Sequence, residues 1–155
     1  MQNPEKSKHL ETATTTIFGN QIDFVNLRCE SYNENSRIPE TIEFGTPLQD
    51  ALRRDITINS LFYNISSNQV EDYIEKGLDD LKNGIIRTPI DPFITFSDDP
   101  LRVLRVFRFA SRFGFNLVPE ISSALKDEGI KADFGSKISK ERIGDELIKM
   151  LDGKI

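Results

Sequence analysis

Arginines recur at helical spacing in residues 98–112, DDPLRVLRVFRFASR, and form the most distinctive chemical pattern in the chain. At about 100° per residue, all four arginines fall within about a third of a helix circumference, and Asp99 lies beside Arg102. Apolar side chains cover much of the remaining surface, so the helix should be buried on several sides. The arginines are therefore predicted to face a cleft, a partner or paired carboxylates, and Arg105 and Arg108 join Asp99 and Arg102 as candidate nucleotide-binding residues.

Asp99 and Arg102 could read a nucleobase, because a carboxylate beside a guanidinium presents an acceptor next to a donor. Cytosine and adenine each show an amino donor beside a ring-nitrogen acceptor and match this arrangement. Guanine and uracil show the reverse order, which would leave buried groups unpaired at about 1–3 kcal/mol each. The alternative, which spacing alone favours, is that the aspartate caps the helix and the arginines pair with acids elsewhere.

A second cluster of charge lies at Arg53 and Arg54, which are adjacent and flanked by acids. Guanidinium groups bind phosphate oxygens in a bidentate manner, so this pair suits a triphosphate, and Asp55 or Asn59 could hydrogen-bond a ribose hydroxyl. A solvated pair of charges is the alternative interpretation of these residues.

Composition limits the class of protein. The chain has 155 residues, of which 37% are hydrophobic and 29% charged, and it has no run near the roughly 20 apolar residues of a membrane span. One cysteine excludes an internal disulfide and suits a reducing, intracellular compartment. The net charge of −5 argues against nonspecific nucleic-acid binding by the whole chain. No membrane partner is expected.

Strand patterns dominate the first half of the chain. Gly19-Asn20 is a hairpin signal between two runs rich in Thr, Ile, Val and Phe. Residues 29–45 are polar, contain Pro39 and Gly45, and are predicted to be a mobile connection. The predicted strands are residues 13–18, 21–28, 62–65, 69–73 and 85–88.

Helix signals follow. Thr46 to Gln49 forms a capping box with proline at the first helical position, and Asp98 or Asp99 with Pro100 is predicted to start the arginine helix, which Gly114 ends. The predicted helices are one from residue 47, then 78–84, 98–112, 119–127 and 139–151. The fold class is therefore α+β: an antiparallel part at residues 1–88, a proline-marked linker at 89–97, and an all-helical part at 98–155.

Taken together, these residues resemble the class II tRNA nucleotidyltransferases, the CCA-adding enzymes, and the related bacterial-type poly(A) polymerases. The resemblance covers nearly the whole chain. Residues 53–55 with 57, 59 and 61 look like the family's RRD motif, and residues 98–102 resemble its EDxxR base-reading motif with aspartate in place of glutamate. Asp72, Gly77, Asp80 and Leu81 match a hinge-like motif, and residues 138–147 look like the motif that supports the helical neck.

The resemblance implies the C-terminal part of a polymerase-β-like nucleotidyltransferase head, followed by a helical neck. It implies addition of C, C and A to a tRNA 3′ end from CTP and ATP, with Arg53 and Arg54 holding the triphosphate and Asp99 and Arg102 selecting the base. The segments SKHLETAT, DFVNLR and FGTPLQDALRRD resemble the eukaryotic CCA-adding branch more than the bacterial polymerases. The alternatives are a poly(A) polymerase or a non-catalytic nucleotide- or RNA-binding module.

The resemblance also implies Mg²⁺, with Asp23 as the third metal carboxylate. Family members carry an Asp-x-Asp pair upstream of the hairpin, and no Asp-x-Asp occurs in this sequence. Because two-metal transfer requires several carboxylates, the chain is expected to lack an N-terminal segment of the enzyme and to be inactive alone. By resemblance, the compartment is the cytoplasm, the nucleus or the mitochondrion.

Overall fold

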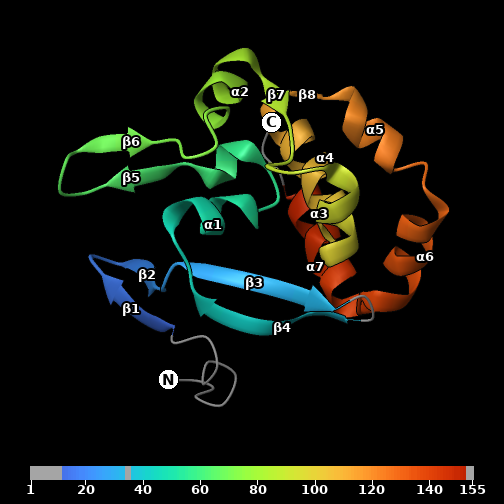
Figure 1. The fold of residues 1–155 in the computed structure, drawn as a ribbon, viewed down its shortest axis with the longest axis horizontal. Coiled ribbons are helices and arrows are strands. Elements are labelled where there is room, and N and C mark those ends of the chain that lie inside the picture. Colours follow the sequence, from blue (N-terminus) through green and yellow to red (C-terminus); the bar gives the residue numbers. More distant parts are fainter. Residues whose placement is uncertain (1–11, 34–35, 153–155) are drawn as a thin grey trace.

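The computed structural model describes residues 12–33 and 36–152, with only the backbone described at residues 30–33 and 36–43. Hairpins occupy the first part of the chain and helices the second (Figure 1), which confirms the predicted α+β class. The strands are β1 Ala13–Ile17, β2 Asn20–Phe24, β3 Arg28–Asn33, β4 Ser36–Phe44, β5 Phe62–Asn64, β6 Gln69–Glu71, β7 Ile85–Ile86 and β8 Asn116–Leu117. The helices are α1 Pro47–Leu52, the 3₁₀ turn η1 Thr57–Ser60, α2 Gly77–Asn83, α3 Pro92–Asp98, α4 Arg102–Phe113, α5 Pro119–Ala124, α6 Glu128–Lys137 and α7 Lys140–Leu151. No helix in this described part is long and apolar enough to cross a membrane.

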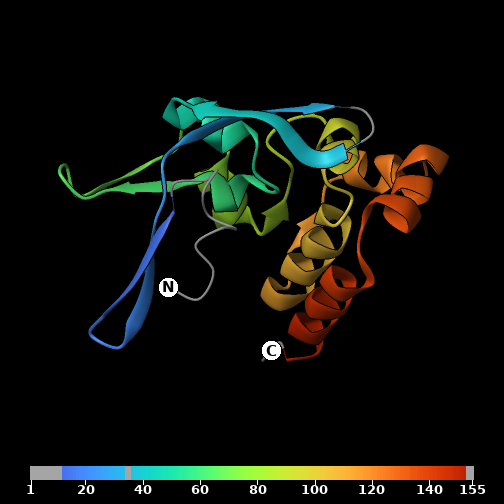
Figure 2. The same cartoon turned by 90° about the horizontal axis from the view of Figure 1, so that it is seen from below.

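The hydrophobic core joins the two parts of the chain. Ile56 and Ile86 pack in one buried cluster with residues of α3, α4, α5 and α6. A parallel pairing of β7 with β8, with Ile86 opposite Leu117, also links the two parts. The buried residues of this core are Ile56, Ile86, Phe96, Val106, Val118, Ile121 and Ile130. Helices α4 and α7 lie side by side at one edge of it (Figure 2).

The first hairpin turns one residue earlier than predicted. Ile17 pairs with Asn20, so the two loop residues are Phe18 and Gly19 rather than Gly19 and Asn20. Both have positive φ, 51° and 80°, as a type I′ turn requires. The strands therefore end at Ile17 and Phe24, and Phe18 is 99% exposed.

Two predicted connections contain regular structure. Residues 29–45, predicted to be a mobile connection, form the antiparallel hairpin β3–β4 with a register shift between Ser31 and Asn33. Residues 89–97, predicted to be a linker, contain most of α3, with Asp91 as N-cap and Pro92 at the first turn. Pro92 therefore starts a helix here instead of marking an extended segment, whereas Pro89 lies before the helix. Helix α6, capped by Asp127, was not predicted.

The arginine helix starts later than predicted. Asp99 is the C-cap residue of α3, and α4 begins at Arg102 without a side-chain cap at its own N-cap, Leu101. The Asp99 carboxylate accepts a hydrogen bond from the Leu101 N–H at 3.3 Å. Gly114 ends α4 with φ 66° in the left-handed region, as predicted.

Gly77 provides a test of the packing between α2 and η1. A Cβ at this position would lie 2.8 Å from the Thr57 carbonyl oxygen and 2.8 Å from Leu61 Cδ2. Gly77→Ala should therefore lower the free energy of unfolding by about 1–3 kcal/mol in urea titrations. The matched control is Gly135→Ala in α6, where a Cβ meets no atom within 4 Å and helix propensity should add about 0.5–1 kcal/mol. Equal effects of the two substitutions would contradict the close packing at Gly77.

Candidate functional site

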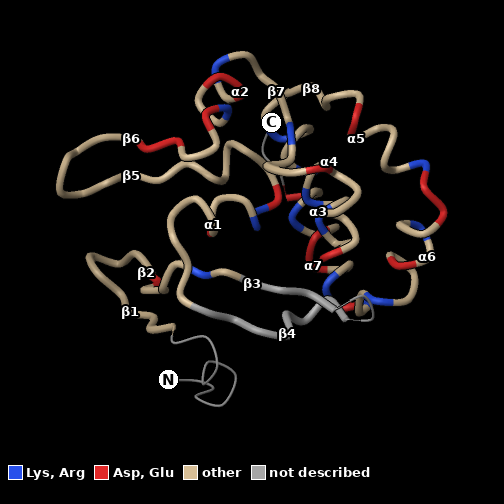
Figure 3. Tube along the Cα trace, in the orientation of Figure 1, with Lys and Arg blue, Asp and Glu red and all other residues tan. Residues whose placement is uncertain are grey.

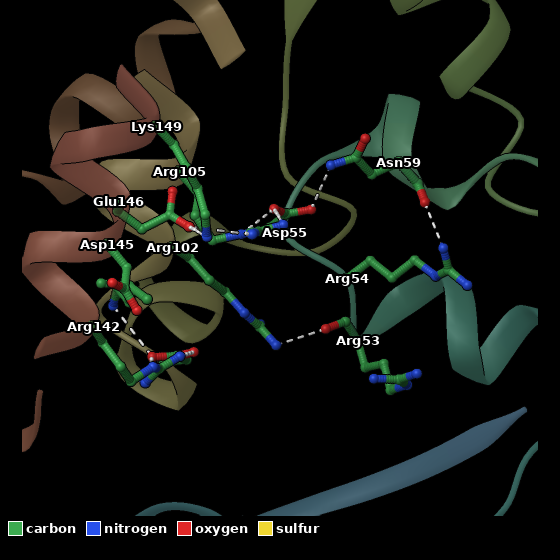
Figure 4. A pocket seen from close by; sticks show the side chains of 12 residues that line it. Arg53, Arg54, Asp55, Asn59, Arg102, Arg105, Arg142, Asp145, Glu146 and Lys149 are labelled. Atoms are coloured by element: carbon green, nitrogen blue, oxygen red, sulfur yellow. Dashed lines mark hydrogen bonds and ion pairs between the residues drawn. The ribbon is translucent and has the colours of Figure 1, made fainter. Parts of the chain in front are cut away.

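A cavity of about 660 Å³ lies between the residues after α1 and the helices α4 and α7 (Figure 4). Six cationic and four anionic side chains line it, and Figure 3 shows charged residues gathered around α4 and α7. The predicted nucleotide-binding residues that line it are Arg53, Arg54, Asp55, Asn59, Asp99, Arg102 and Arg105. Arg108 does not line it, and neither does Asp23. The structure therefore brings the two predicted clusters of charge to one place.

The adjacent arginines are bound to a buried acid. Asp50 Oδ2 accepts hydrogen bonds from Nε and Nη2 of Arg54 at 3.0 and 2.7 Å, and Oδ1 accepts from Nε of Arg53 at 2.9 Å. Arg54 also donates from Nη1 to the Asn59 carbonyl oxygen at 2.7 Å and lies over the Phe62 ring. Both side chains are therefore held in defined positions, although a quarter of Arg53 and a third of Arg54 remain exposed to solvent.

Asp55 connects the two sides of the cavity. Its Oδ2 accepts from Nε of Arg105 on α4 at 2.7 Å, and the guanidinium Nη2 lies 2.6 Å away. Its Oδ1 accepts from the Asn59 side-chain amide and from the Ile56 N–H, both at 3.0 Å. Arg105 therefore fixes the position of an acid that precedes it by 50 residues.

The predicted base-reading pair lines the cavity, and the Arg102 backbone N–H donates to the Asp99 carbonyl oxygen at 3.0 Å, but the two side chains bind other partners. Asp99 accepts from both terminal nitrogens of Arg142 on α7, at 3.2 and 2.8 Å. Arg102 donates to the carbonyl oxygens of Arg53 at 2.7 Å and Thr95 at 3.3 Å. A carboxylate has about four acceptor positions, so Asp99 retains acceptor capacity beside Arg142.

Glu146 on α7 completes the network and explains the position of Arg108. The residue is 2% exposed, and its carboxylate accepts from Arg108 Nε at 2.8 Å and from Lys149 at 3.0 Å and lies 3.7 Å from Arg105. Burial alone would raise the pKa of Glu146, but the hydrogen bonds from Lys149 and Arg108 outweigh it and hold the pKa below its usual value. Arg108 thus forms a buried ion pair with Glu146 and does not line the cavity.

Sequence reasoning missed the contribution of α7 to the cavity. Arg142, Asp145, Glu146 and Lys149 all line it. The last three lie three, four and seven residues after Arg142, which places all four on one helical face. This charged face was a signal in the sequence that it packs against the arginines of α4.

A metal centre is not assembled by the described residues. Asp23 is exposed and accepts a hydrogen bond from the Thr14 hydroxyl across the first hairpin at 2.6 Å. Within the described part of the chain, no three His, Cys, Asp or Glu side chains lie together in a way that could hold a metal ion. The role of Asp23 as a metal carboxylate therefore stays a prediction.

Comparisons with known proteins agree on one family. A family model described as the poly A polymerase head domain matches residues 1–87. The mitochondrial CCA tRNA nucleotidyltransferase of Saccharomyces cerevisiae is 59% identical over 98% of this chain and 28% of its own length. Poly(A) polymerase I of Escherichia coli O6:H1 is 38% identical over 70% of this chain and 22% of its own.

A solved structure shows the same fold. The Bacillus stearothermophilus CCA-adding enzyme in complex with CTP matches with a TM-score of 0.76 and 27% identity, over 95% of this chain and 34% of that one. This chain therefore spans less than a third of the length of the curated relatives reported above.

Glu146 gives a pH test of the buried network. A carboxyl group with a lowered pKa in the folded state contributes stability above its ordinary pKa of about 4.3, and this contribution is lost as the pH falls through the lower folded value. Glu146→Gln should lower the free energy of unfolding by about 3 kcal/mol at pH 7. Urea titrations between pH 7 and pH 3 should show this difference shrink on acidification. The control Glu128→Gln removes an exposed acid and should change stability by less than about 1 kcal/mol throughout; a pH-independent effect of Glu146→Gln would contradict the assignment.

Proposed function

The chain belongs to the poly A polymerase head domain family, and from this premise we propose that it forms the nucleotide-binding part of an enzyme that adds C, C and A to tRNA 3′ ends. The carrying observation is that one cavity gathers Arg53 and Arg54 with Asp99 and Arg102, although Arg102 and Arg53 are 49 positions apart. A nucleoside triphosphate needs cations for its phosphates and a donor beside an acceptor for its base. Arg53 and Arg54 could supply the first, and Asp99 with Arg102 the second. The identity of 59% with a CCA tRNA nucleotidyltransferase supports the same activity.

The residues of the cavity suggest a role for each part of the nucleotide. Arg53 and Arg54 bind the triphosphate, and Asp55 or the Asn59 amide binds the ribose. Asp99 accepts a hydrogen bond from the amino group of cytosine or adenine, while Arg102 donates a hydrogen bond to the adjacent ring nitrogen. For this, Arg102 must exchange its bond with the Arg53 carbonyl oxygen for one with the base. The reaction joins the tRNA 3′ oxygen to the α-phosphorus and releases pyrophosphate.

The part of this chain in that reaction is to bind and orient the nucleotide. The described residues do not form a metal site, and the sequence contains no Asp-x-Asp pair. We therefore assign none of the described residues to the Mg²⁺ expected for the whole enzyme. The mitochondrial name of the Saccharomyces relative supports an intracellular site of action: the mitochondrion, the nucleus or the cytoplasm.

Nucleotide titration tests the base reader. The chain should bind CTP and ATP more tightly than GTP and UTP in calorimetry, and Asp99→Ala should reduce this preference by about 1–3 kcal/mol. Asp145→Ala is a matched control because it removes the same charge from the same cavity. It should shift the affinity for all four nucleotides together. Equal affinity of the unaltered chain for the four nucleotides would remove the role proposed for Asp99 and Arg102.

A chimera tests the reaction. Replacing the matching 152-residue region of the Saccharomyces enzyme with this chain should give an enzyme that adds two C residues from CTP alone and completes CCA when ATP is also present. The unaltered relative and the chimera carrying Asp99→Ala are the controls. An A tail made from ATP alone would support the second candidate, a poly(A) polymerase, which the 38% identity with the Escherichia coli enzyme brings into consideration. No incorporation by the chimera would contradict both.

A further inference from the structure

Asp50 lies behind the cavity and binds both of its adjacent arginines. The residue is 1% exposed and does not line the cavity itself. One carboxylate oxygen accepts from Nε and Nη2 of Arg53, and the other accepts from Nε and Nη2 of Arg54. The oxygen that binds Arg53 also accepts the backbone N–H of Arg28 at 3.1 Å. Asp50 is thereby fixed at the start of β3 as well as within α1.

This arrangement solves a geometric difficulty. Consecutive residues on a helix point about 100° apart, so two neighbouring arginines at the end of α1 would not ordinarily turn toward one ligand. Asp50 stands three and four residues before them, on the face that both can reach. Because each guanidinium is planar and uses two nitrogens on one oxygen, the acid restricts both the position and the plane of each group.

The acid is ionised, and its charge acts against its geometric effect. Burial alone would raise the pKa of Asp50, but hydrogen bonds from Arg54, Arg53 and the Arg28 backbone outweigh it and hold the pKa below its usual value. A negative charge beside a triphosphate site repels the ligand. Orientation of the arginines favours binding of the ligand, whereas the charge of the acid opposes it, so the two contributions differ in sign.

We propose that Asp50 is a positioning residue for the nucleotide's triphosphate, which holds Arg53 and Arg54 in the orientation in which both line the cavity. The inference rests on the proposed function, because it assumes that these arginines bind phosphate. It predicts that loss of the acid weakens triphosphate binding even though it makes the site more positive.

The test compares CTP with cytidine, which has the base and ribose but no phosphate. Chemical-shift titrations of the full chain should show that Asp50→Asn weakens CTP binding by about tenfold, the worth of one charge-assisted hydrogen bond. Cytidine binding should be unchanged, and this also shows that the cavity is folded. Asp79→Asn on α2 removes the same charge from an exposed site and should change neither affinity. Unchanged or tighter CTP binding by Asp50→Asn would overturn the proposal, since the charge alone predicts tighter binding.

A second variant covers the case in which Asp50→Asn does not fold. Asp50→Glu keeps the charge but moves the carboxylate by one methylene, so it should also weaken CTP binding and spare cytidine binding. Retained CTP affinity in this variant would overturn the proposal. If the unaltered chain bound cytidine as tightly as CTP, the proposed function would fail and the inference with it. If the unaltered chain preferred CTP and both Asp50 variants kept that preference, the inference alone would fail.

Discussion

Buried carboxylates determine how the cavity is built. Asp50, Asp55 and Glu146 are 1%, 6% and 2% exposed, and an isolated charge at such depth costs several kcal/mol unless it is paired and hydrogen-bonded. Each is satisfied by arginine. Arg105 bonds Asp55 from across the cavity and also lies near Glu146. The buried acids are therefore stable only where arginines surround them. The cavity lies at this place, where helices from two parts of the chain meet.

The same pairing determines what a ligand encounters. Asp99 is bound to Arg142, and Arg102 to the carbonyl oxygen of Arg53, so the proposed acceptor and donor for a base each have a partner of their own. In the function proposed here, a base that pairs with both would replace the Arg53 carbonyl oxygen as the partner of Arg102 and would use the remaining acceptor capacity of Asp99. A base with donor and acceptor reversed gains nothing in exchange. The bond from Arg102 to the Arg53 backbone also links the part of the cavity proposed to bind the base to the part proposed to bind phosphate.

Local signals in the sequence predicted local structure well, and distant partners could not be predicted from them. The capping box at Thr46 and the left-handed Gly114 were correct because neighbouring residues decide them. The prediction of a mobile connection at residues 29–45 was wrong, because polar composition does not indicate which two strands pair. Residues 53–55 and 98–102 could be identified as chemical candidates from type and spacing. That Asp99 binds Arg142 depends on the packing of α7 against α4, which no spacing within either helix specifies.

One hydrophobic core runs across the boundary proposed between the head and neck parts. Ile56 and Ile86 come from before residue 89, yet they pack with Phe96 and Val106. The parallel pair of β7 and β8 adds backbone hydrogen bonds across the same boundary. Because separating these parts would expose that core, Arg53 and Asp99 stand on surfaces whose separation is fixed by packing. Under the proposed function, adjustment to a cytosine or an adenine within the described part of the chain would then fall to side chains such as Arg102, whose hydrogen bonds can exchange without disturbing the core.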